Sequence, residues 1–286
     1  PHGMSERGMG SAVGQVPEYV EMVTRWCKTH TNMPVLVKLT PNVTSILGPA
    51  GAAKAGGGDG VSLINTVNSI TSIDLDLMAP TPTVDGKGSH GGYCGPAVKP
   101  MALHMCAEIA RNAGTAGLPM SAIGGISNWR DAAEFIALGA GTTQVCTAVM
   151  HYGFKIVEDM IDGLSDWMDQ KGYEKISDFQ GLAVPNITDW QNLNMNYEIV
   201  AEIEQAKCVK CGLCHIVCED TSHQAISAER IDGERKYSVI DDECVGCNLC
   251  MHVCPENCIT MRKVDNGKDY MNWTQDPRNP FSTAAE

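Results

Sequence analysis

The sequence has few basic residues, no basic cluster and no long apolar run. Of its 286 residues, 21 are Lys or Arg and 34 are Asp or Glu, which gives a formal net charge of −13. A chain this acidic is a poor candidate for binding nucleic acid or an anionic membrane surface. No apolar stretch reaches the roughly 18 residues of a membrane-spanning helix, so we expect no membrane partner. The apolar fraction of 43% is still enough to build a sizeable core.

Cysteine, in contrast, is abundant and ordered. Eight of the 13 cysteines form two copies of the pattern C-x2-C-x2-C-x3-C, and Pro255 follows the second copy. This spacing is typical of proteins with two [4Fe–4S] clusters, because each tight turn supplies three thiolates and its fourth cysteine completes the neighbouring cluster. We therefore assign one cluster to Cys208, Cys211, Cys214 and Cys254, and the other to Cys244, Cys247, Cys250 and Cys218.

Zinc and haem are the alternatives for these cysteines. Zinc ribbons pair two C-x2-C units, which would leave the third and fourth cysteine of each copy without a role. Cys211, Cys214 and His215 spell the haem motif C-x2-C-H, but Cys208 and Cys218 would then be unexplained. The remaining cysteines are scattered singly, which predicts no disulfide framework. Together with oxygen-sensitive clusters, this indicates a cytoplasmic protein.

Upstream of the cluster motifs, continuous apolar runs alternate with helical patterns. We predict helices over 17–30, 98–112, 128–138 and 153–170, a helical segment up to Gly58 interrupted by Pro49, and strands over 35–39, 61–64, 119–124 and 143–149. Such alternation indicates a parallel sheet covered on its faces. The first helix has no strand before it, so the pattern fits the C-terminal half of a (β/α)8 TIM barrel. A flavodoxin-like doubly wound sheet is the alternative.

The chain divides into parts of different composition. We expect the half barrel over residues 1–171, a linker over 172–203, a small ferredoxin-like two-cluster domain over 204–262 and a polar tail over 263–286. Residues 66–96 form a long loop of the kind that is often functional. The sequence opens at Pro1 inside a glycine-rich loop, so we expect a fragment of a longer protein.

Polar residues at the carboxyl ends of the predicted strands are the candidates for a site, because ligands of such barrels bind there. Lys38 interrupts an apolar strand, where it could meet an anionic ligand or extend to the barrel rim. Asn65 and Thr66 end the next strand, where they could recognise a planar heterocycle or cap a turn. Each of these alternatives stays open on the sequence alone.

Two glycines offer a candidate anion site. Gly124 and Gly125 end the third strand just before a predicted helix, an arrangement that suits a phosphate but also an ordinary turn. The loop after the last strand, with Cys146 and Thr147, is a further candidate, although a single Cys146 is more often a small buried hydrophobe. Cys94, in the long loop, is at most a weak candidate nucleophile.

Together these features resemble the dihydropyrimidine dehydrogenases, in particular the catalytic subunit of the bacterial NAD-dependent type. The matching segments are PHGMSERGMG, VKLTPNVT, SLINTVNSI, GSHGGYCGPAVKP, IGGIS, QVCTAV, and the two cluster motifs with CEDTSHQAI and CVGCNLCMHVCP. The resemblance implies an FMN-binding barrel that reduces the C5=C6 bond of uracil or thymine. It also implies electrons that come from NADH through a partner flavoprotein subunit and two [4Fe–4S] clusters.

The resemblance also implies roles for single residues. Asn65 and Thr66 would contact the pyrimidine, and the FMN contacts would be Lys38 and Gly95, with Ile123, Gly124, Gly125, Cys146 and Thr147 around its phosphate. The family's catalytic cysteine would stand just before Pro1, so we expect the sequence as given to be inactive. The stretch from Cys254 to Cys258 is one residue shorter than is usual in the family, and Cys258 is not needed as a ligand.

A partner subunit is also expected. Gly86, Gly88 and Gly91 satisfy G-x-G-x-x-G, but they follow no predicted strand and open no predicted helix, so this is no dinucleotide fingerprint. We therefore expect NADH to be oxidised on a second subunit that carries FAD and iron–sulfur centres, in a hetero-oligomer. A non-enzymatic electron-transfer module and a flavoenzyme similar to dihydroorotate dehydrogenase are the alternatives.

Overall fold

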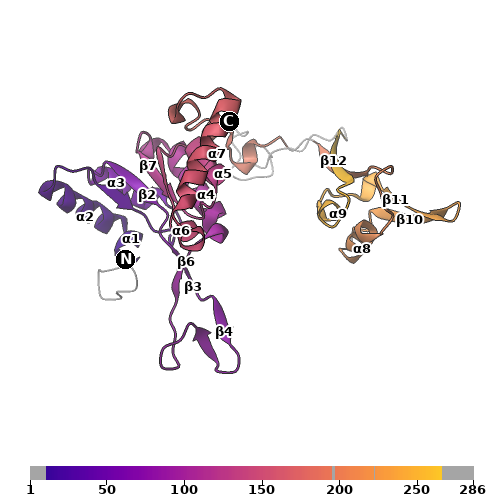
Figure 1. The fold of residues 1–286 in the computed structure, drawn as a ribbon, viewed down its shortest axis with the longest axis horizontal. Coiled ribbons are helices and arrows are strands. Elements are labelled where there is room, and N and C mark those ends of the chain that lie inside the picture. Colours follow the sequence, from indigo (N-terminus) through magenta and orange to yellow (C-terminus); the bar gives the residue numbers. More distant parts are fainter. Residues whose placement is uncertain (1–10, 195–196, 222, 266–286) are drawn as a thin grey trace, which may run out of the picture. The chain divides into compact units, whose positions relative to one another are not determined.

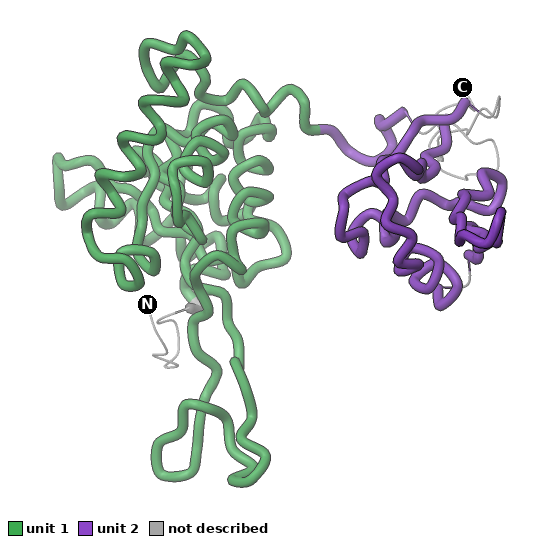
Figure 2. The backbone as a smooth tube through the Cα atoms, turned by 45° about the vertical axis from the view of Figure 1, so that its right-hand side comes forward, with its two compact units in different colours: residues 1–187 green, residues 188–286 purple. Residues whose placement is uncertain are grey.

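The computed structural model describes residues 11–194, 197–221 and 223–265. The chain divides into two compact units, residues 1–187 and 188–286 (Figure 2). The glycine-rich opening segment 1–10 and most of the expected polar tail lie outside the described residues. None of the described helices is long and apolar enough to cross a membrane.

A four-stranded parallel sheet organises the first unit (Figure 1). Its strand order is β1-β2-β7-β8, with bounds Leu36–Lys38, Gly60–Leu63, Met120–Ile123 and Thr142–Gln144. The strands stand in sequence order and are joined by helical crossovers, as the sequence predicts for part of a β/α barrel. The two central strands are buried along most of their length, in agreement with their continuous apolar runs.

The helices of this unit lie close to the predicted ranges. They are α1 Ser11–Gln15, α2 Pro17–His30, α3 Leu47–Ala55, α4 Lys99–Arg111, α5 Trp129–Ala137, α6 Thr147–Tyr152 and α7 Lys155–Lys171. Pro49 does not interrupt α3 as expected, because the helix begins at Leu47 and Pro49 falls in its first turn, where backbone N–H groups need no helical partner.

Two details of the sheet differ from the prediction. The expected strand 143–149 ends at Gln144, and its second half forms the helix α6 instead. The expected buried strand 35–39 is half exposed, with Leu36 53% exposed, because β1 lies at the edge of the described sheet. An apolar run therefore predicted the strand correctly but did not show which strands have neighbours on both sides.

The long segment 66–96 is not an irregular loop but a pair of β-ribbons. Strand β3 (Val67–Ser69) pairs with β6 (Gly91–Tyr93), and β4 (Ser72–Asp74) pairs with β5 (Ala79–Thr81), both antiparallel. The ribbons form an arm that extends from the carboxyl end of β2 and returns to the short 3-10 helix Pro96–Val98 (Figure 1). The arm returns the chain to the same edge of the sheet, so both of its ends can contribute to one site.

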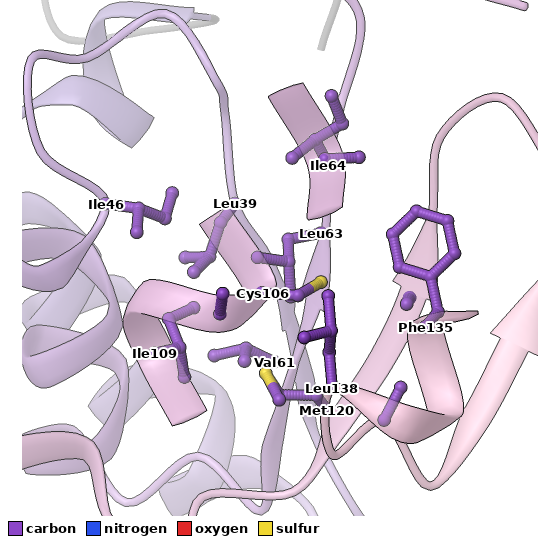
Figure 3. Packing of buried hydrophobic residues seen from close by; sticks show 14 of the residues in the cluster. Leu39, Ile46, Val61, Leu63, Ile64, Cys106, Ile109, Met120, Phe135 and Leu138 are labelled. Carbon is purple, nitrogen blue, oxygen red and sulfur yellow. The ribbon is translucent and has the colours of Figure 1, made fainter. Parts of the chain in front are cut away.

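The core of the first unit lies between the sheet and its helices. Figure 3 shows Val61 and Leu63 of β2 beside Cys106 and Ile109 of α4, and all four are fully buried. Burial of one such aliphatic side chain contributes about 1.5–3 kcal/mol relative to exposure. The core thus fixes the positions of the strand ends that follow it.

The second unit contains both cysteine motifs. Its strands are β9 (Glu198–Ile203), which pairs with β12 (Ile259–Val264), and β10 (Ile226–Ile231), which pairs with β11 (Glu234–Val239). The helices α8 (Leu213–Asp220) and α9 (Leu249–His252) each begin inside a cysteine motif. In both motifs a residue with a left-handed backbone precedes the helix, Gly212 in the first and Asn248 in the second, and these residue types adopt that conformation most readily.

Much of the expected linker 172–203 is structured. Phe179 is buried at 2% exposure and packs with Trp167 and Tyr173 in the first unit. At the other end, β9 is the partner of β12 in the second unit. The polar composition of the segment concealed both features, because β9 pairs with a strand more than fifty residues away in the chain.

Candidate functional site

A cleft at the carboxyl ends of the parallel strands collects every barrel residue that the sequence analysis selected. Its cavity volume is about 230 Å³, more than ten times that of the two hollows in the second unit. The predicted residues that line it are Lys38, Asn65, Thr66, Gly95, Ile123, Gly124, Gly125, Cys146 and Thr147. These residues span more than 100 positions of sequence, and the parallel sheet brings them to one edge.

Lys38 ends the edge strand β1 and is exposed in the described structure. Its ammonium is therefore not buried in this structure, and its contact with an anionic ligand remains a prediction. Among the described residues that line the cleft, Lys38 is the only cation.

Two glycine-containing loops line the cleft, one at the end of the arm and one directly after β7. Gly95 and Gly125 have φ angles of +89° and +75°, which favour glycine. A Cβ atom on Gly125 would lie 2.9 Å from the Gly95 carbonyl oxygen and 2.8 Å from the Lys99 Cβ. A Cβ on Gly124 would lie 2.7 Å from that of Ala102. The glycines are thus needed for close approach of the two loops.

A polar clamp fixes these loops. Asp131, 6% exposed in the first turn of α5, accepts hydrogen bonds from Lys99 Nζ at 2.6 Å, from the Ser127 backbone N–H at 2.8 Å and from Asn128 Nδ2 at 3.0 Å. The hydrogen bond to Asp131 raises the pKa of Lys99, so the ammonium form is favoured. Asn128 caps the helix by accepting from the Arg130 and Asp131 N–H groups.

Asn65 and Thr66 are half-buried where β2 passes into the arm. The Asn65 N–H donates to the Leu39 carbonyl at 2.9 Å, and the Thr66 carbonyl accepts from Asn42 Nδ2 at 3.1 Å. Their backbones are therefore held by the segment that follows β1. Within the described residues no hydrogen bond engages the Asn65 side-chain amide, so it remains available to a ligand in the cleft.

Cys94 and Cys146 both line the cleft and are exposed. The expectation that Cys146 is a small buried hydrophobe is wrong, because Cys146 stands in the turn between β8 and α6 and not inside a strand. The Thr147 Oγ1 lies 3.3 Å from the Cys94 Sγ, which joins the end of the arm to the loop after the last strand.

Tyr93 and Gln144 are among the lining residues that the sequence analysis did not select. Gln144 Nε2 donates to Ser62 Oγ at 2.9 Å and to Ser121 Oγ at 2.7 Å, so it links three strands below the cleft. Its position two residues before Cys146, at the end of β8, was an available signal. Tyr93 carried no signal, because the local sequence does not reveal the pairing of β6 with β3.

The second unit has two small hollows, each surrounded by four predicted cluster cysteines. The first hollow is lined by Cys208, Cys211, Cys214 and Cys254, and the second hollow by Cys218, Cys244, Cys247 and Cys250. The structure thus brings together the same two groups of four that the spacing suggested. Each hollow takes its fourth cysteine from the other motif.

Backbone N–H groups point at several of these sulfurs. Ala225 N–H donates to Cys218 Sγ at 3.2 Å, Ala201 N–H to Cys244 Sγ at 3.5 Å and Cys258 N–H to Cys254 Sγ at 3.4 Å. Burial raises the pKa of the Cys214 thiol to about 11. A metal that binds this sulfur must therefore displace its proton, and metal affinity depends on pH.

The donor set fits a cluster better than a single ion. Among the described residues, no three Cys, His, Asp or Glu side chains converge closely enough to hold one metal ion. Thiols spread around a hollow suit a larger inorganic group, and sulfur is its preferred ligand. His215 of the C-x2-C-H motif lies with Nδ1 2.6 Å from the Ile226 carbonyl oxygen, so that ring nitrogen is engaged by the backbone.

Comparison with known proteins identifies both units. The family model described as dihydroorotate dehydrogenase matches residues 7–168, and the one described as a 4Fe-4S dicluster domain matches residues 201–261. A domain of the first kind implies FMN, and one of the second kind implies two [4Fe–4S] clusters.

Three relatives share much of the chain. The NAD-dependent dihydropyrimidine dehydrogenase subunit PreA of Escherichia coli (strain K12) is 45% identical over 261 residues, 91% of this chain and 63% of that protein. The chloroplastic dihydropyrimidine dehydrogenase (NADP(+)) of Arabidopsis thaliana is 38% identical, covering 74% of this chain and 50% of that protein. The catalytic subunit of dihydroorotate dehydrogenase B (NAD(+)) of Pyrococcus horikoshii is 40% identical, covering 62% and 56%.

The chain thus spans less than two thirds of the length of these relatives. The first family model nevertheless covers more than half of the chain, and the predicted fold class, a partial β/α barrel followed by a two-cluster domain, is confirmed. The chain belongs to the dihydroorotate dehydrogenase family, carries a 4Fe-4S dicluster domain, and resembles the PreA-type dihydropyrimidine dehydrogenase subunit as its sequence predicts.

Proposed function

We propose that the protein to which this chain belongs reduces the C5=C6 bond of uracil or thymine to the 5,6-dihydropyrimidine. The observation that carries the proposal is the convergence of Lys38, Asn65, Thr66 and the loop Gly124-Gly125 on one cleft, in a chain 45% identical to a dihydropyrimidine dehydrogenase subunit. A site for a flavin and a pyrimidine requires a cation, polar side chains and exposed backbone, and these residues supply them from the ends of three different strands.

The cleft fits FMN by the chemistry of its lining. Gly95, Gly124 and Gly125 present backbone without a side chain to the cleft, so a phosphate or a flavin edge could approach closely at these positions. Ile123, Cys146 and Thr147 also line the cleft. Lys38 supplies the positive charge that stabilises an electron-rich ring, and Asn65 and Thr66 supply the donors and acceptors that orient a pyrimidine.

Two [4Fe–4S] clusters in the hollows would carry single electrons, and FMN would convert them to the two-electron reduction of the ring. The role of the second unit is to hold the eight cysteine thiolates in two groups and to exclude water around them. The surroundings of the cysteines are apolar, because Ile226, Tyr237 and Ile259 belong to the same buried hydrophobic cluster. An apolar shell and backbone N–H groups are the protein's means of setting a cluster's potential.

We further propose a partner subunit that oxidises NADH through FAD and passes electrons to the clusters. The PreA relative is named as a subunit of an NAD-dependent enzyme, which supports this assembly. The placement of the G-x-G-x-x-G glycines supports it as well, since Gly86 and Gly91 lie in the β-ribbon arm, and no helix among the described elements begins there.

A dihydroorotate dehydrogenase reaction is the second candidate, because the Pyrococcus horikoshii enzyme is 40% identical over 178 residues. Orotate carries a ring carboxylate, which a site would pair with a cation. Lys38 is the only cation among the described lining residues, and it is the one assigned to the flavin. This distribution of charge favours an uncharged pyrimidine.

The test uses protein expressed from its whole gene and purified without oxygen. FMN, iron and sulfide contents are measured, and dihydrouracil formation is followed with dithionite as the reductant. We expect FMN, two clusters and product. Protein that binds clusters but no FMN and forms no dihydropyrimidine would support the electron-transfer module instead.

A further inference from the structure

The first hollow contains a fifth thiol. Cys258 lines this hollow together with Cys208, Cys211, Cys214 and Cys254. Its side chain is buried, with 4% of the residue exposed, and its Sγ lies 3.4 Å from the Sγ of Cys254. The spacing of the two motifs assigns no role to this cysteine.

The backbone of Cys258 is held firmly beside the hollow. Its N–H donates to Cys254 Sγ at 3.4 Å, and its carbonyl accepts from the Glu204 N–H at 2.8 Å. Strand β12 begins at the next residue, Ile259, which pairs with Ile203 of β9. Because the sheet fixes the backbone, rotation of the side chain is the motion available to the sulfur.

The second hollow has the same local arrangement but lacks the fifth thiol. There Ala225 stands where Cys258 stands in the first hollow: its N–H donates to the fourth cysteine, Cys218, at 3.2 Å. Strand β10 begins at the next residue, Ile226, as β12 does after Cys258. Ala225 is also buried, at 2% exposure. Among the described residues that line the second hollow, the only cysteines are the four predicted ligands.

We propose that Cys258 is a reserve ligand of the cluster in the first hollow, able to replace Cys254. The inference rests on the proposed cluster sites. A thiolate is the same ligand type as the one it would replace, and the neighbouring sulfur is close enough for a side-chain rotation to exchange them. On exchange, an iron–sulfur bond to Cys258 replaces the one to Cys254, and the Cys258 proton passes to solvent.

The proposal makes the two clusters unequal. The cluster in the first hollow survives loss of its fourth cysteine, whereas the cluster in the second hollow does not survive loss of Cys218. The difference comes from one position, Cys258 in the first hollow and Ala225 in the second. Tolerance to loss of the fourth cysteine should therefore be transferable from the first hollow to the second by substitution at Ala225.

The experiment measures iron and sulfide per chain, and the electron paramagnetic resonance of the reduced clusters, in the full chain prepared without oxygen. Unaltered protein and the Cys258→Ala variant come first, and both should hold two clusters, since Cys258 is not one of the eight ligands. Unaltered protein without clusters would contradict the proposed function itself, which separates that failure from failure of the reserve ligand.

The decisive variants remove the fourth cysteine. We expect Cys254→Ala to keep both clusters, with an altered resonance for one, and Cys254→Ala/Cys258→Ala to lose half of its iron. Cys218→Ala should lose half of its iron, and Cys218→Ala/Ala225→Cys should regain it. The proposal is overturned if Cys254→Ala loses a cluster or does not fold, or if the Cys254→Ala/Cys258→Ala variant keeps both.

Discussion

Lys99 and Asp131 form an ion pair with 2.6 Å between Nζ and Oδ1, and this pair joins the two loops that wall the cleft. Lys99 begins α4 just after the Gly95 loop, and Asp131 lies in the first turn of α5 just after Gly124-Gly125. Neither residue lines the cleft itself. The pair therefore positions the site without contacting a ligand there.

Replacing Asp131 should destabilise the first unit. Asp131→Ala removes the acceptor for Lys99 and leaves the Ser127 N–H without its partner, so we expect a loss of about 2–3 kcal/mol in the free energy of unfolding. Glu134→Ala is the matched control, because Glu134 pairs with the same lysine at 3.0 Å but its side chain is 47% exposed. The Glu134→Ala substitution should lower the free energy of unfolding by less than about 1 kcal/mol. Urea unfolding of both variants checks the difference, and equal losses would contradict it.

Gly125→Ala should weaken FMN binding and stability together. The φ of +75° costs a residue with a Cβ about 1–2 kcal/mol, and the new Cβ would also collide with Lys99 and the Gly95 carbonyl. Gly86→Ala is the control that separates backbone strain from the collision, because Gly86 has φ +73° and no atom within 4 Å of its added Cβ. In this control we expect only the loss of stability from backbone strain. Its flavin affinity, measured by quenching of FMN fluorescence, should be unchanged.

Lys38→Met should slow pyrimidine reduction by about 100-fold, the usual cost of removing one group that stabilises developing negative charge. The flavin's reduction potential should fall in the same variant, since the cation favours the electron-rich form. Lys155→Met removes the same charge at the start of α7, outside the cleft, and should leave both quantities unchanged. An unchanged potential in Lys38→Met would show that Lys38 does not contact the flavin.

Asp59 provides a stabilisation that depends on pH. Its Oδ2 accepts from Lys28 Nζ of α2 and from the Val35 N–H, both at 2.7 Å. The hydrogen bond from Lys28, followed by the one from Val35, holds the pKa of Asp59 below its ordinary value of 3.8. Because the folded-state pKa is depressed, the stabilisation is present above pH 3.8 and is lost as the pH falls through the folded value.

We therefore expect Asp59→Asn to be less stable than unaltered protein at neutral pH, and the difference to shrink in acid. Denaturant midpoints of the two proteins across this pH range provide the measurement. A difference that stays constant with pH would show that the charge of Asp59 contributes nothing.

Local patterns in the sequence were sufficient for much of this fold. The two cysteine motifs grouped Cys218 and Cys254 with distant partners because the geometry of a C-x2-C-x2-C turn is local and rigid. The residues of the cleft could be selected for a similar reason, since parallel strands place all their carboxyl ends at one edge. Gly124 and Asn65 were found by their position at strand ends and needed no further information.

Features that depend on distant pairing were not accessible. The partner of Lys99 lies 32 residues away, and nothing in the local pattern couples the two. The exposure of Lys38 depends on β1 being an edge strand, which a run of apolar residues does not reveal. Cys258 is a different case, because it stands only four residues after Cys254 and the conformation of that turn places its sulfur beside the Cys254 sulfur.

The most direct test of the proposed function is the choice of substrate by the reduced enzyme. Protein from the whole gene, with its cofactors, is reduced without oxygen and mixed with either uracil or orotate, and reoxidation of the flavin is followed by its absorbance. We predict rapid reoxidation by uracil and little by orotate, because the described cleft offers no cation beyond Lys38 for a ring carboxylate. Rapid reoxidation by orotate with none by uracil would contradict the account and assign the chain to dihydroorotate oxidation.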